Sequence, residues 1–182
     1  MSRGSKRPFA EVMPTAQHII SVLAPFCERI EVGGSLRRKR PFIGDIEIVA
    51  LPQRARNLFG EPVLDKPTAL DLFLADKVGG GMIKNGNLYK QFGYGRFMVD
   101  LVLPASAAHW GAIYMIRTGS HEFNMWMMNR HAPSQRVRFR NGLLYDSKNT
   151  LILTHEETAV FAALNLPFIP PTRRDDGRWR QE

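Results

Sequence analysis

The sequence contains little cysteine, and Cys27 is the only one among 182 residues. A single cysteine excludes an internal disulfide framework and is typical of a reducing compartment, so we expect a cytoplasmic location. The five histidines show neither paired metal-ligand spacing nor a cysteine partner, so we expect structural roles for them. Cys27 follows a predicted helix, and we expect it to be buried and inert.

Long hydrophobic runs, repeats and low-complexity tracts are absent. No segment approaches the roughly 20 consecutive apolar residues that a membrane span needs. Residues 1–8 carry basic side chains with no apolar stretch behind them, which excludes a secretory signal. The 44% of hydrophobic residues suffices for a buried core. We therefore expect a soluble protein with no membrane contact, built as one medium domain or two small lobes.

Negative charge is scarce relative to positive charge. The chain has 17 acidic residues against 25 lysines and arginines, a net charge of +8. The basic residues form three clusters without acids: Arg3, Lys6 and Arg7; Arg37, Arg38, Lys39 and Arg40; Arg130, Arg136, Arg138 and Arg140. Such clusters displace counterions from phosphates, which favours a polyanionic partner. Solvated charge that merely aids solubility is the alternative.

The hydrophobic pattern predicts an α+β chain. In the first part we expect helices at 14–26 and from Thr68 to about residue 78, and strands at 30–32, 43–51 and about 96–103. Thr68 and Asp71 have the spacing of a capping box, and the glycines at 79–81 end that helix. Asn85-Gly86 predicts a hairpin turn.

The second part is expected to begin near Pro104. The pattern predicts helices at 105–115 and 122–130, the latter with Ser120 as N-cap, a hairpin turning at Asn141-Gly142, a helix opened by a Thr154 and Glu157 capping box, and a partly extended tail. In the hairpin, alternation places Arg136, Arg138 and Arg140 on one face and Val137 and Phe139 on the other. The arginine face is either solvated or in contact with phosphates, and the lack of balancing acids favours phosphates.

Three carboxylates occupy unusual positions. Residues two apart in a strand point the same way, so Asp45 and Glu47 are expected side by side in the strand at 43–51. Asp100 lies in an otherwise apolar strand and needs a partner. Together the three acids would form an oxygen-ligand cage for Mg²⁺ or Mn²⁺. An ordinary half-exposed strand with a polar face is the alternative.

The glycine turn (residues 33–35: Gly33, Gly34 and Ser35) precedes these acids. Two glycines let backbone N–H groups approach an anion closely, Ser35 adds a hydroxyl, and the basic residues 37–40 follow at once. No Gly-Lys-Ser/Thr follows, so the turn is not a Walker P-loop. A phosphate cradle beside a metal cage is what phosphoryl transfer requires.

These residues resemble a known family. The glycine turn followed by Asp45, Glu47 and Asp100 is similar to the signature of the polymerase-beta-like nucleotidyltransferase superfamily. More narrowly, five short segments are similar in order and spacing to family X DNA polymerases: residues 34–38, 44–47, 99–101, 118–120 and 123–124. The resemblance covers about residues 14–174. It implies a minimal palm-plus-thumb form: a nucleotidyltransferase palm with a mixed sheet and flanking helices at 1–104, and a small α/β thumb at 105–182, without fingers or lyase domain.

The resemblance also implies roles for individual residues. Asp45 and Glu47 would ligate two Mg²⁺ or Mn²⁺ ions, and Asp100 would bind the catalytic ion and help activate the primer 3′-hydroxyl. The nucleotide contacts would come from seven residues: Gly34, Ser35, Arg38, Thr118, Gly119, Ser120 and Asn124. Asp65, Asp71, Asp146 and Glu157 match no catalytic position, so we expect surface or capping roles for them.

The sequence also departs from the family pattern. Glu47 stands where Asp is usual, Ile116-Arg117 replaces the aromatic pair before the Thr-Gly-Ser turn, and Met125 and Met128 replace basic residues. We expect a monomeric DNA-directed DNA polymerase that fills short gaps in DNA repair, with dNTP and a primer-template or gapped duplex as substrates. A template-independent nucleotidyltransferase acting on RNA, a small molecule or a protein is the alternative, and a non-catalytic nucleic-acid-binding protein is a third possibility.

Overall fold

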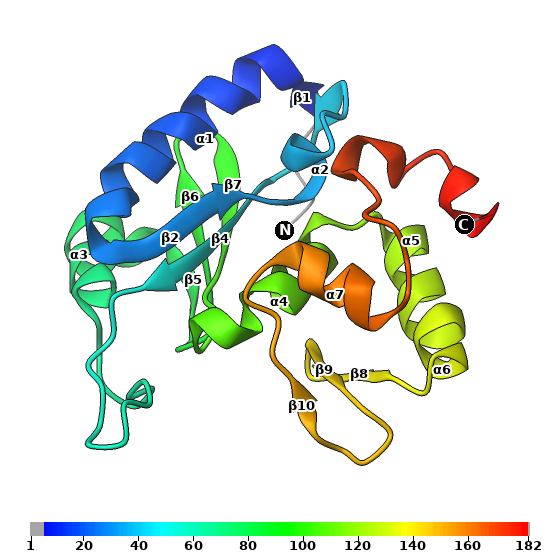
Figure 1. Ribbon diagram of the computed structural model, residues 1–182. Helices are drawn as coiled ribbons and strands as arrows, with labels where there is room; N and C mark the ends of the chain where they lie inside the picture. Colours follow the sequence, from blue (N-terminus) through cyan, green and yellow to red (C-terminus); the bar gives the residue numbers. More distant parts are fainter. Residues whose placement is uncertain (1–5, 182) are drawn as a thin grey trace. The chain divides into compact units, whose positions relative to one another are not determined.

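The computed structural model describes residues 6–181, and the chain divides into two compact units (Figure 1). The first unit comprises Met1–Leu36 and Arg40–Ser106, and the second comprises Arg37–Lys39 and Ala107–Glu182. Arg3 lies outside the described residues, as does the side chain of Arg130. No helix within residues 6–181 is long and apolar enough to cross a membrane.

A five-stranded mixed sheet forms the centre of the first unit, with strand order β2-β4-β7-β6-β5. Its strands are β2 (Cys27–Val32), β4 (Ile46–Pro52), β5 (Met82–Asn85), β6 (Tyr89–Tyr94) and β7 (Phe97–Val102). The neighbours β4 and β7 run parallel, and the other neighbouring pairs are antiparallel. The predicted α+β class with a mixed sheet is therefore confirmed.

Helices α1 (Phe9–Leu23) and α3 (Ala69–Val78) pack against one face of this sheet. The core between them takes every second residue of the two parallel strands: Ile46, Ile48 and Ala50 from β4, Val99 and Leu101 from β7. Because side chains alternate along a strand, Glu47 and Asp100 project from the opposite face. Cys27 belongs to this core as predicted, and burial raises the pKa of its thiol to about 11, which keeps it unreactive.

The strand predicted at 43–51 is interrupted. Phe42–Ile43 forms the short strand β3, which pairs with β1 (Arg7–Pro8), and the chain then bends at Gly44 and Asp45 before β4 begins at Ile46. The expectation that Asp45 and Glu47 share one strand is therefore wrong. Ile43 contributes its backbone to a different sheet, which the apolar pattern alone did not reveal.

Other boundaries of the first unit also differ from expectation. Helix α1 begins at Phe9 and contains Pro14, and strands β5 and β6 were not predicted because polar residues interrupt the apolar pattern of both segments. The capping box of Thr68 and Asp71 is confirmed, and the predicted glycine end of α3 continues as the 3₁₀ turn η2 (Gly79–Gly81). Two further short elements are η1 (Ala24–Phe26) and α2 (Gly34–Arg37).

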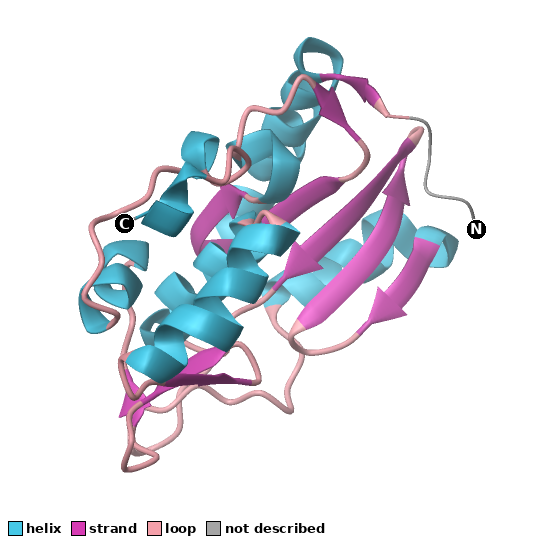
Figure 2. Cartoon of the chain, turned by 90° about the vertical axis from the view of Figure 1, so that its right-hand side faces the viewer, coloured by secondary structure: helices cyan, strands magenta, loops and turns pink. Residues whose placement is uncertain are grey.

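The second unit is mainly helical with a small antiparallel sheet (Figure 2). Its helical elements are η3 (Ala107–His109), α4 (Trp110–Thr118), α5 (His121–Trp126), the π-helical η4 (Met127–His131), α6 (Ala132–Ser134), α7 (Glu157–Ala163), η5 (Pro171–Arg173) and η6 (Arg178–Gln181). Strands β8 (Arg138–Arg140), β9 (Leu143–Tyr145) and β10 (Leu151–Ile152) form the sheet. Asn141 and Gly142 both have positive φ at the β8–β9 turn, which confirms the predicted hairpin.

Two parts of the second unit differ from expectation. Helix α7 has Glu156 as N-cap without a side-chain cap; the Thr154 hydroxyl instead accepts a hydrogen bond from the Ala112 N–H of α4 at 3.1 Å. The tail is extended only at residues 166–170, and regular structure does not end there, because η5 and η6 follow. Trp179 is buried in the core of this unit and contacts Phe123 edge to face, with 5.5 Å between ring centroids. Apolar burial thus continues past Pro167, Pro170 and Pro171.

A buried ion pair joins α3 to the sheet of the first unit. Lys90 of β6 is only 2% exposed, and its Nζ lies 2.6 Å from Asp71 Oδ1 and 2.5 Å from Asn85 Oδ1. Burial of the Asp71 carboxyl raises its pKa, but hydrogen bonds from Lys90 and Thr68 outweigh this and hold the pKa below its ordinary value of 3.8. Asp71 therefore both caps α3 and neutralises Lys90.

Asp71→Ala is expected to lower the free energy of unfolding by about 3 kcal/mol, because it leaves the Lys90 charge buried without its carboxylate partner. Lys90→Met should cost less, since the partly exposed Asp71 keeps its capping bonds. Because the folded-state pKa of Asp71 is depressed, the difference between wild type and Asp71→Ala should shrink as the pH falls through that pKa. Urea unfolding at neutral pH and in strong acid measures this; equal destabilisation by both variants would contradict it.

Candidate active site

Two of the predicted catalytic acids lie at the same level on neighbouring strands. Glu47 of β4 pairs in register with Asp100 of β7, and both project from the sheet face opposite α1 and α3. Register partners on parallel strands bring their side chains close together, so the fold places two carboxylates next to each other at the centre of the sheet. Neither is fully buried.

Hydrogen bonds from β6 orient the Asp100 carboxylate. The Tyr89 hydroxyl donates to Oδ1 at 2.7 Å, and Gln91 Nε2 donates to the same oxygen at 2.8 Å. Gln91 is the register partner of Asp100 on β6. Because both donors bind Oδ1, they fix the carboxylate in one orientation. This support could not be predicted from the sequence, because β6 was not predicted.

The glycine turn packs directly against Glu47. The Gly33 N–H donates to the Glu47 carbonyl at 2.7 Å, and Gly34 begins α2 with a φ of +54°. A Cβ placed on Gly34 would lie 2.2 Å from Glu47 Oε2 and 3.1 Å from its Cβ. Only glycine therefore allows the turn to approach this acid so closely. The predicted contact of the turn with a phosphate stays a prediction.

Asp45 lies in the bend that precedes β4, half-exposed and two residues before Glu47. Within residues 6–181, no three Asp, Glu, His or Cys side chains gather closely enough to hold a metal ion. The predicted site of three carboxylates thus stays a prediction. The donor chemistry of Glu47 and Asp100 fits Mg²⁺ or Mn²⁺, because these ions prefer carboxylate oxygens.

Of the seven predicted nucleotide-contact residues, Gly34 and Ser35 belong to the first unit and the other five belong to the second. Thr118 ends α4, Gly119 has a φ of +72°, and the Gly119–Ser120 peptide is cis. As predicted, Ser120 is the N-cap of α5: its hydroxyl accepts from the Phe123 N–H at 3.3 Å. The same hydroxyl donates to the Arg174 carbonyl at 2.7 Å, which ties the turn to the tail.

Arg38 is held by two groups of the second unit. Its guanidinium donates to the Thr118 carbonyl and, through Nε, to Asp175 Oδ2 at 3.0 Å. A Cβ on Gly119 would lie 2.9 Å from Arg38 Nη1, so Gly119 makes room for this guanidinium. The predicted phosphate ligand is therefore positioned beside the 118–120 turn, close to other residues assigned to nucleotide contact.

The largest difference from the sequence-based prediction concerns Glu157, for which a surface or capping role was expected. Instead of lying at the surface, it is 5% exposed, and its two oxygens bind two arginines: Arg37 Nη2 at 2.7 Å and Arg174 Nη1 at 2.7 Å. Arg174 is fully buried and also donates to the Ile169 carbonyl. Its burial lowers its pKa, whereas the Glu157 charge raises it. The only sequence signal for this role was the basic cluster at residues 37–40, which contains no acid. An arginine of that cluster that becomes buried needs a carboxylate from elsewhere in the chain.

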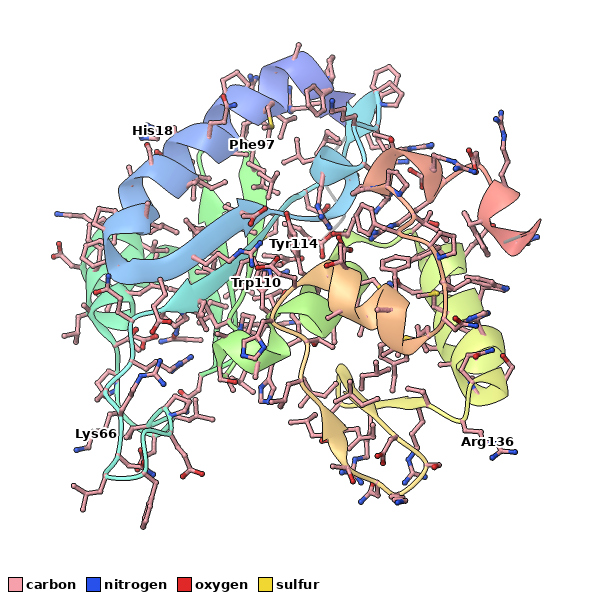
Figure 3. All side chains as sticks on the ribbon, viewed as in Figure 1. His18, Lys66, Phe97, Trp110, Tyr114 and Arg136 are labelled. Carbon is pink, nitrogen blue, oxygen red and sulfur yellow. The ribbon has the colours of Figure 1, made fainter. Side chains whose placement is uncertain are left out.

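Arg37 is held on a second side as well. Its Nη1 donates to the Thr118 hydroxyl at 2.6 Å, and its guanidinium lies 3.7 Å from the centre of the Tyr114 ring. The Tyr114 ring in turn lies 5.2 Å from that of Trp110, and Figure 3 shows the two labelled side chains next to each other. Arg37 thus fixes the C-terminal end of α4, where the 118–120 turn begins.

Asn124 has an incompletely satisfied amide. Its Nδ2 donates to the Ile116 carbonyl at 2.7 Å, whereas its buried Oδ1 has no hydrogen-bond partner among the described residues. A buried acceptor without a donor is costly unless something supplies one. The position is consistent with the predicted contact to a nucleotide, which stays a prediction.

The predicted basic face of the hairpin is exposed. Arg136, Arg138 and Arg140 are all exposed, while Val137 is buried and Phe139 half-buried, so the predicted alternation is confirmed. Arg136 points away from the body of its unit in Figure 3. Arg138 Nη2 donates to Asn149 Oδ1 at 3.0 Å, and the Arg140 guanidinium lies 4.3 Å from the centre of the Tyr145 ring. Contact with DNA phosphates stays a prediction.

Gly34→Ala is expected to destabilise the chain by more than the roughly 1–2 kcal/mol that a left-handed non-glycine residue costs, because its methyl group also meets the Glu47 carboxylate. Gly95→Ala is the matched control, since Gly95 has a φ of +56° but open space around its Cβ position. Urea unfolding of both variants isolates the steric contribution. Equal losses would contradict the contact with Glu47.

Glu157→Gln is expected to lower the free energy of unfolding by about 3 kcal/mol, because it leaves the Arg174 charge buried without a carboxylate. The control is Glu156→Gln at the exposed neighbouring position, which should change stability by about 0.5 kcal/mol at most. Chemical denaturation monitored by tryptophan fluorescence can follow both, since Trp179 packs in the same core. Similar stabilities for the two variants would refute the bridging role of Glu157.

Comparison with known proteins supports the resemblance. A model of the DNA polymerase beta thumb family matches residues 114–175. The chain is similar to the crystal structure of a ternary gap complex of Leishmania infantum polymerase beta, with a TM-score of 0.70 and 20% identity over 94% of this chain and 71% of that one. A ternary P/T complex of the same protein gives a TM-score of 0.70 and 18% identity, over 95% and 78%. No curated protein matches the chain.

Both solved structures share the α+β architecture described above, and the matched thumb segment lies wholly in the second unit. The predicted fold is therefore confirmed: the chain has a polymerase-beta-like fold.

Proposed function

We propose that this protein is a family X DNA-directed DNA polymerase that transfers a nucleotide from a dNTP to a primer 3′-hydroxyl. One observation carries the proposal: the glycine turn packs on Glu47, which lies in register with Asp100 on the neighbouring parallel strand. Backbone N–H groups suited to an anion and two adjacent carboxylates thus lie together in one unit. That combination suits a substrate with both phosphates and a hydroxyl to be activated.

The carboxylates Asp45, Glu47 and Asp100 would hold two Mg²⁺ or Mn²⁺ ions, which lower the pKa of a bound hydroxyl and neutralise charge on the phosphates. In the reaction the primer 3′-oxygen forms a bond to the α-phosphorus, and the bond from that phosphorus to the pyrophosphate oxygen breaks. Asp100 would accept the proton that the 3′-hydroxyl loses, and the donors Tyr89 and Gln91 keep its carboxylate in place for this role. The electron pair of the broken bond stays on the pyrophosphate oxygen, and pyrophosphate leaves as an anion.

The nucleotide contacts are assigned to Gly34, Ser35, Arg38, the turn formed by Thr118, Gly119 and Ser120, and Asn124. Gly34 and Ser35 offer backbone N–H groups and a hydroxyl at the start of α2. Arg38 already donates to Thr118 and Asp175, so phosphate binding exchanges at least one of these bonds for a bond to the ligand. The unpartnered Oδ1 of Asn124 is suited to accept a hydrogen bond from a nucleotide base.

DNA is the proposed partner, as a primer-template or a gapped duplex, and short-gap filling in DNA repair is the proposed role. The net charge of +8 and the exposed arginines 136, 138 and 140 support binding to a polyanion. We propose that the chain acts as a monomer. The fold class it shares with the Leishmania infantum polymerase beta complexes is consistent with these assignments.

Asp100→Ala is expected to reduce nucleotide incorporation at least about a thousandfold, because it removes the carboxylate that serves the attacking hydroxyl. Extension of a labelled primer across a short gap, with Mg²⁺ or Mn²⁺, measures this. Asp76→Ala is the matched control, since its side chain lies on α3 and is 71% exposed. Full activity of Asp100→Ala would rule out the mechanism.

The same assay separates the two nucleotidyltransferase hypotheses. A DNA-directed enzyme incorporates the nucleotide complementary to the template base, so changing that base should change which dNTP is used. Incorporation that ignores the template base would instead support the template-independent alternative. Parallel reactions with ribonucleotides determine whether the enzyme prefers deoxyribose or ribose. This preference is open because Ile116 and Arg117 stand in place of the usual aromatic pair before the 118–120 turn.

A further inference from the structure

The tip loop (residues 53–67) connects β4 to α3 and carries the most exposed apolar side chains of the described chain. Leu58 is 102% exposed and Phe59 is 89% exposed, relative to their reference areas. No other two consecutive large hydrophobic residues within 6–181 are both exposed. In Figure 1 this loop extends away from the sheet, beyond the end of β4, and Figure 3 shows its Lys66 pointing to solvent.

The loop is not a loose connection, because its own hydrogen bonds shape it. Asn57 is central: its Oδ1 accepts from the N–H groups of Phe59 and Glu61, each at 2.9 Å, and its Nδ2 donates to Glu61 Oε2 at 2.9 Å. The backbone adds Asn57 N–H to the Glu61 carbonyl and Gly60 N–H to the Asn57 carbonyl. Leu58 and Phe59 are thus held at the outermost point of an ordered turn, so a ligand would not have to order them.

The loop is anchored to the first unit at its base. The Gln53 N–H donates to the Phe26 carbonyl at 3.0 Å, and Arg54 Nη2 donates to the Asn87 carbonyl at 3.0 Å. Arg56 donates to the Gly60 carbonyl at 2.9 Å and lies 3.6 Å from Glu28, yet its side chain is still 57% exposed. A guanidinium accessible to solvent therefore lies two residues before the apolar tip (Leu58 and Phe59).

The apolar tip is remote from the carboxylates along the sheet. Asp45 lies just before the first residue of β4 and the tip loop follows its last, so the seven residues of β4 separate them. At about 3.3 Å per residue this amounts to roughly 20 Å. A stacked nucleic-acid strand covers that distance in about six nucleotides. The tip can therefore contact a substrate strand without occupying the place where the chemistry is proposed.

The size of the apolar tip decides which partner it suits. A stable protein interface buries about 800 Å² on each side, whereas an aromatic side chain supplies at most about 250 Å². A leucine and a phenylalanine on a convex turn fall short of a protein interface. One exposed ring is enough, however, for stacking on an unpaired base, and every base presents a π-face.

We propose that the apolar tip binds an unpaired base of single-stranded DNA, with Phe59 stacked on the base and Leu58 covering its edge. Arg56 contacts the adjacent phosphate. The loop has one more basic than acidic residue, with Arg54, Arg56 and Lys66 against Glu61 and Asp65, and the net charge of +8 attracts the strand to the protein. The contact rests on the proposed DNA partner but requires no nucleotide transfer.

The test is binding of a fluorescein-labelled 16-nucleotide oligo-dT and of a blunt duplex of equal length, measured by anisotropy without dNTP. The double variant Leu58→Ser/Phe59→Ser should bind the oligo-dT roughly 5- to 150-fold more weakly, the range measured for losing one stacked aromatic. Its duplex affinity should change by less than about twofold, and its salt dependence should be unaltered because no charge is removed.

Two matched variants complete the test. Leu72→Ser removes another exposed apolar side chain, 64% exposed on α3, and should leave both affinities unchanged. Phe59→Trp keeps an aromatic ring and should retain affinity for the oligo-dT, and its added tryptophan fluorescence should be quenched on binding. Because both tip residues are exposed, circular dichroism should show the double variant folded.

The proposal is overturned if the double variant binds the oligo-dT like wild type, if both DNAs lose affinity equally, or if the wild type binds no oligo-dT. Unchanged DNA binding with a shift in sedimentation would identify the tip as a protein interface instead, which also overturns it. Failure of the proposed polymerase is a separate result. If the wild type incorporates no nucleotide, the proposed polymerase activity is refuted. If the double variant nevertheless binds the oligo-dT more weakly than that wild type, the contact at the apolar tip is supported.

Discussion

The contact between the backbone of the glycine turn and the Glu47 side chain is the constraint on which the site depends. Strands β2 and β4 are antiparallel neighbours, so the turn that ends β2 returns to the start of β4, where Glu47 lies. Any Cβ at Gly34 would collide with the carboxylate, so only a residue without a side chain lets the backbone of the turn lie this close to the acid. The parallel pairing of β4 with β7 then places Asp100 beside Glu47. A local property of one residue and a long-range sheet register thus produce the site jointly.

Buried ion pairs perform a similar stabilising task in each unit. In the first, Lys90 and Asp71 join a helix to the sheet, and the carboxylate also caps that helix. In the second, Glu157 accepts from Arg37 and Arg174 at once, and Arg37 holds the end of α4 through Thr118. Such pairs cost desolvation energy, and replacing them with apolar groups can be neutral for stability. Their value lies in geometry: the first fixes the start of α3 against the sheet, and the second fixes the end of α4, where the candidate 118–120 turn begins.

Much of the fold could be predicted from local patterns, and the failures have physical causes. The Thr68 and Asp71 cap, the Asn141-Gly142 turn and the Ser120 cap depend on residues within four positions, and each was confirmed. The split of the strand at 43–51 depends on pairing with Arg7–Pro8, and the burial of Glu157 depends on Arg37, 120 residues earlier. Neither partner is visible in a sequence window. For the candidate site, the glycine turn and the pairing of Glu47 with Asp100 followed from the motifs, whereas the supporting donors Tyr89 and Gln91 lie on a strand that showed no apolar pattern.

The assignment of Arg37–Lys39 to the second unit has a consequence for dissecting the molecule. The connection near Ser106 looks like the natural place to divide the chain into two fragments, since both units have their own hydrophobic clusters. A fragment starting there would lack Arg37 and Arg38, however, and would leave Glu157 and Asp175 without these guanidiniums. The complementary fragment would expose the same two arginines. Each unit is thus compact, but a single cut of the chain cannot separate the two. Residues 37–39 precede the rest of the second unit by about seventy residues, yet they supply the guanidiniums that pair with its carboxylates.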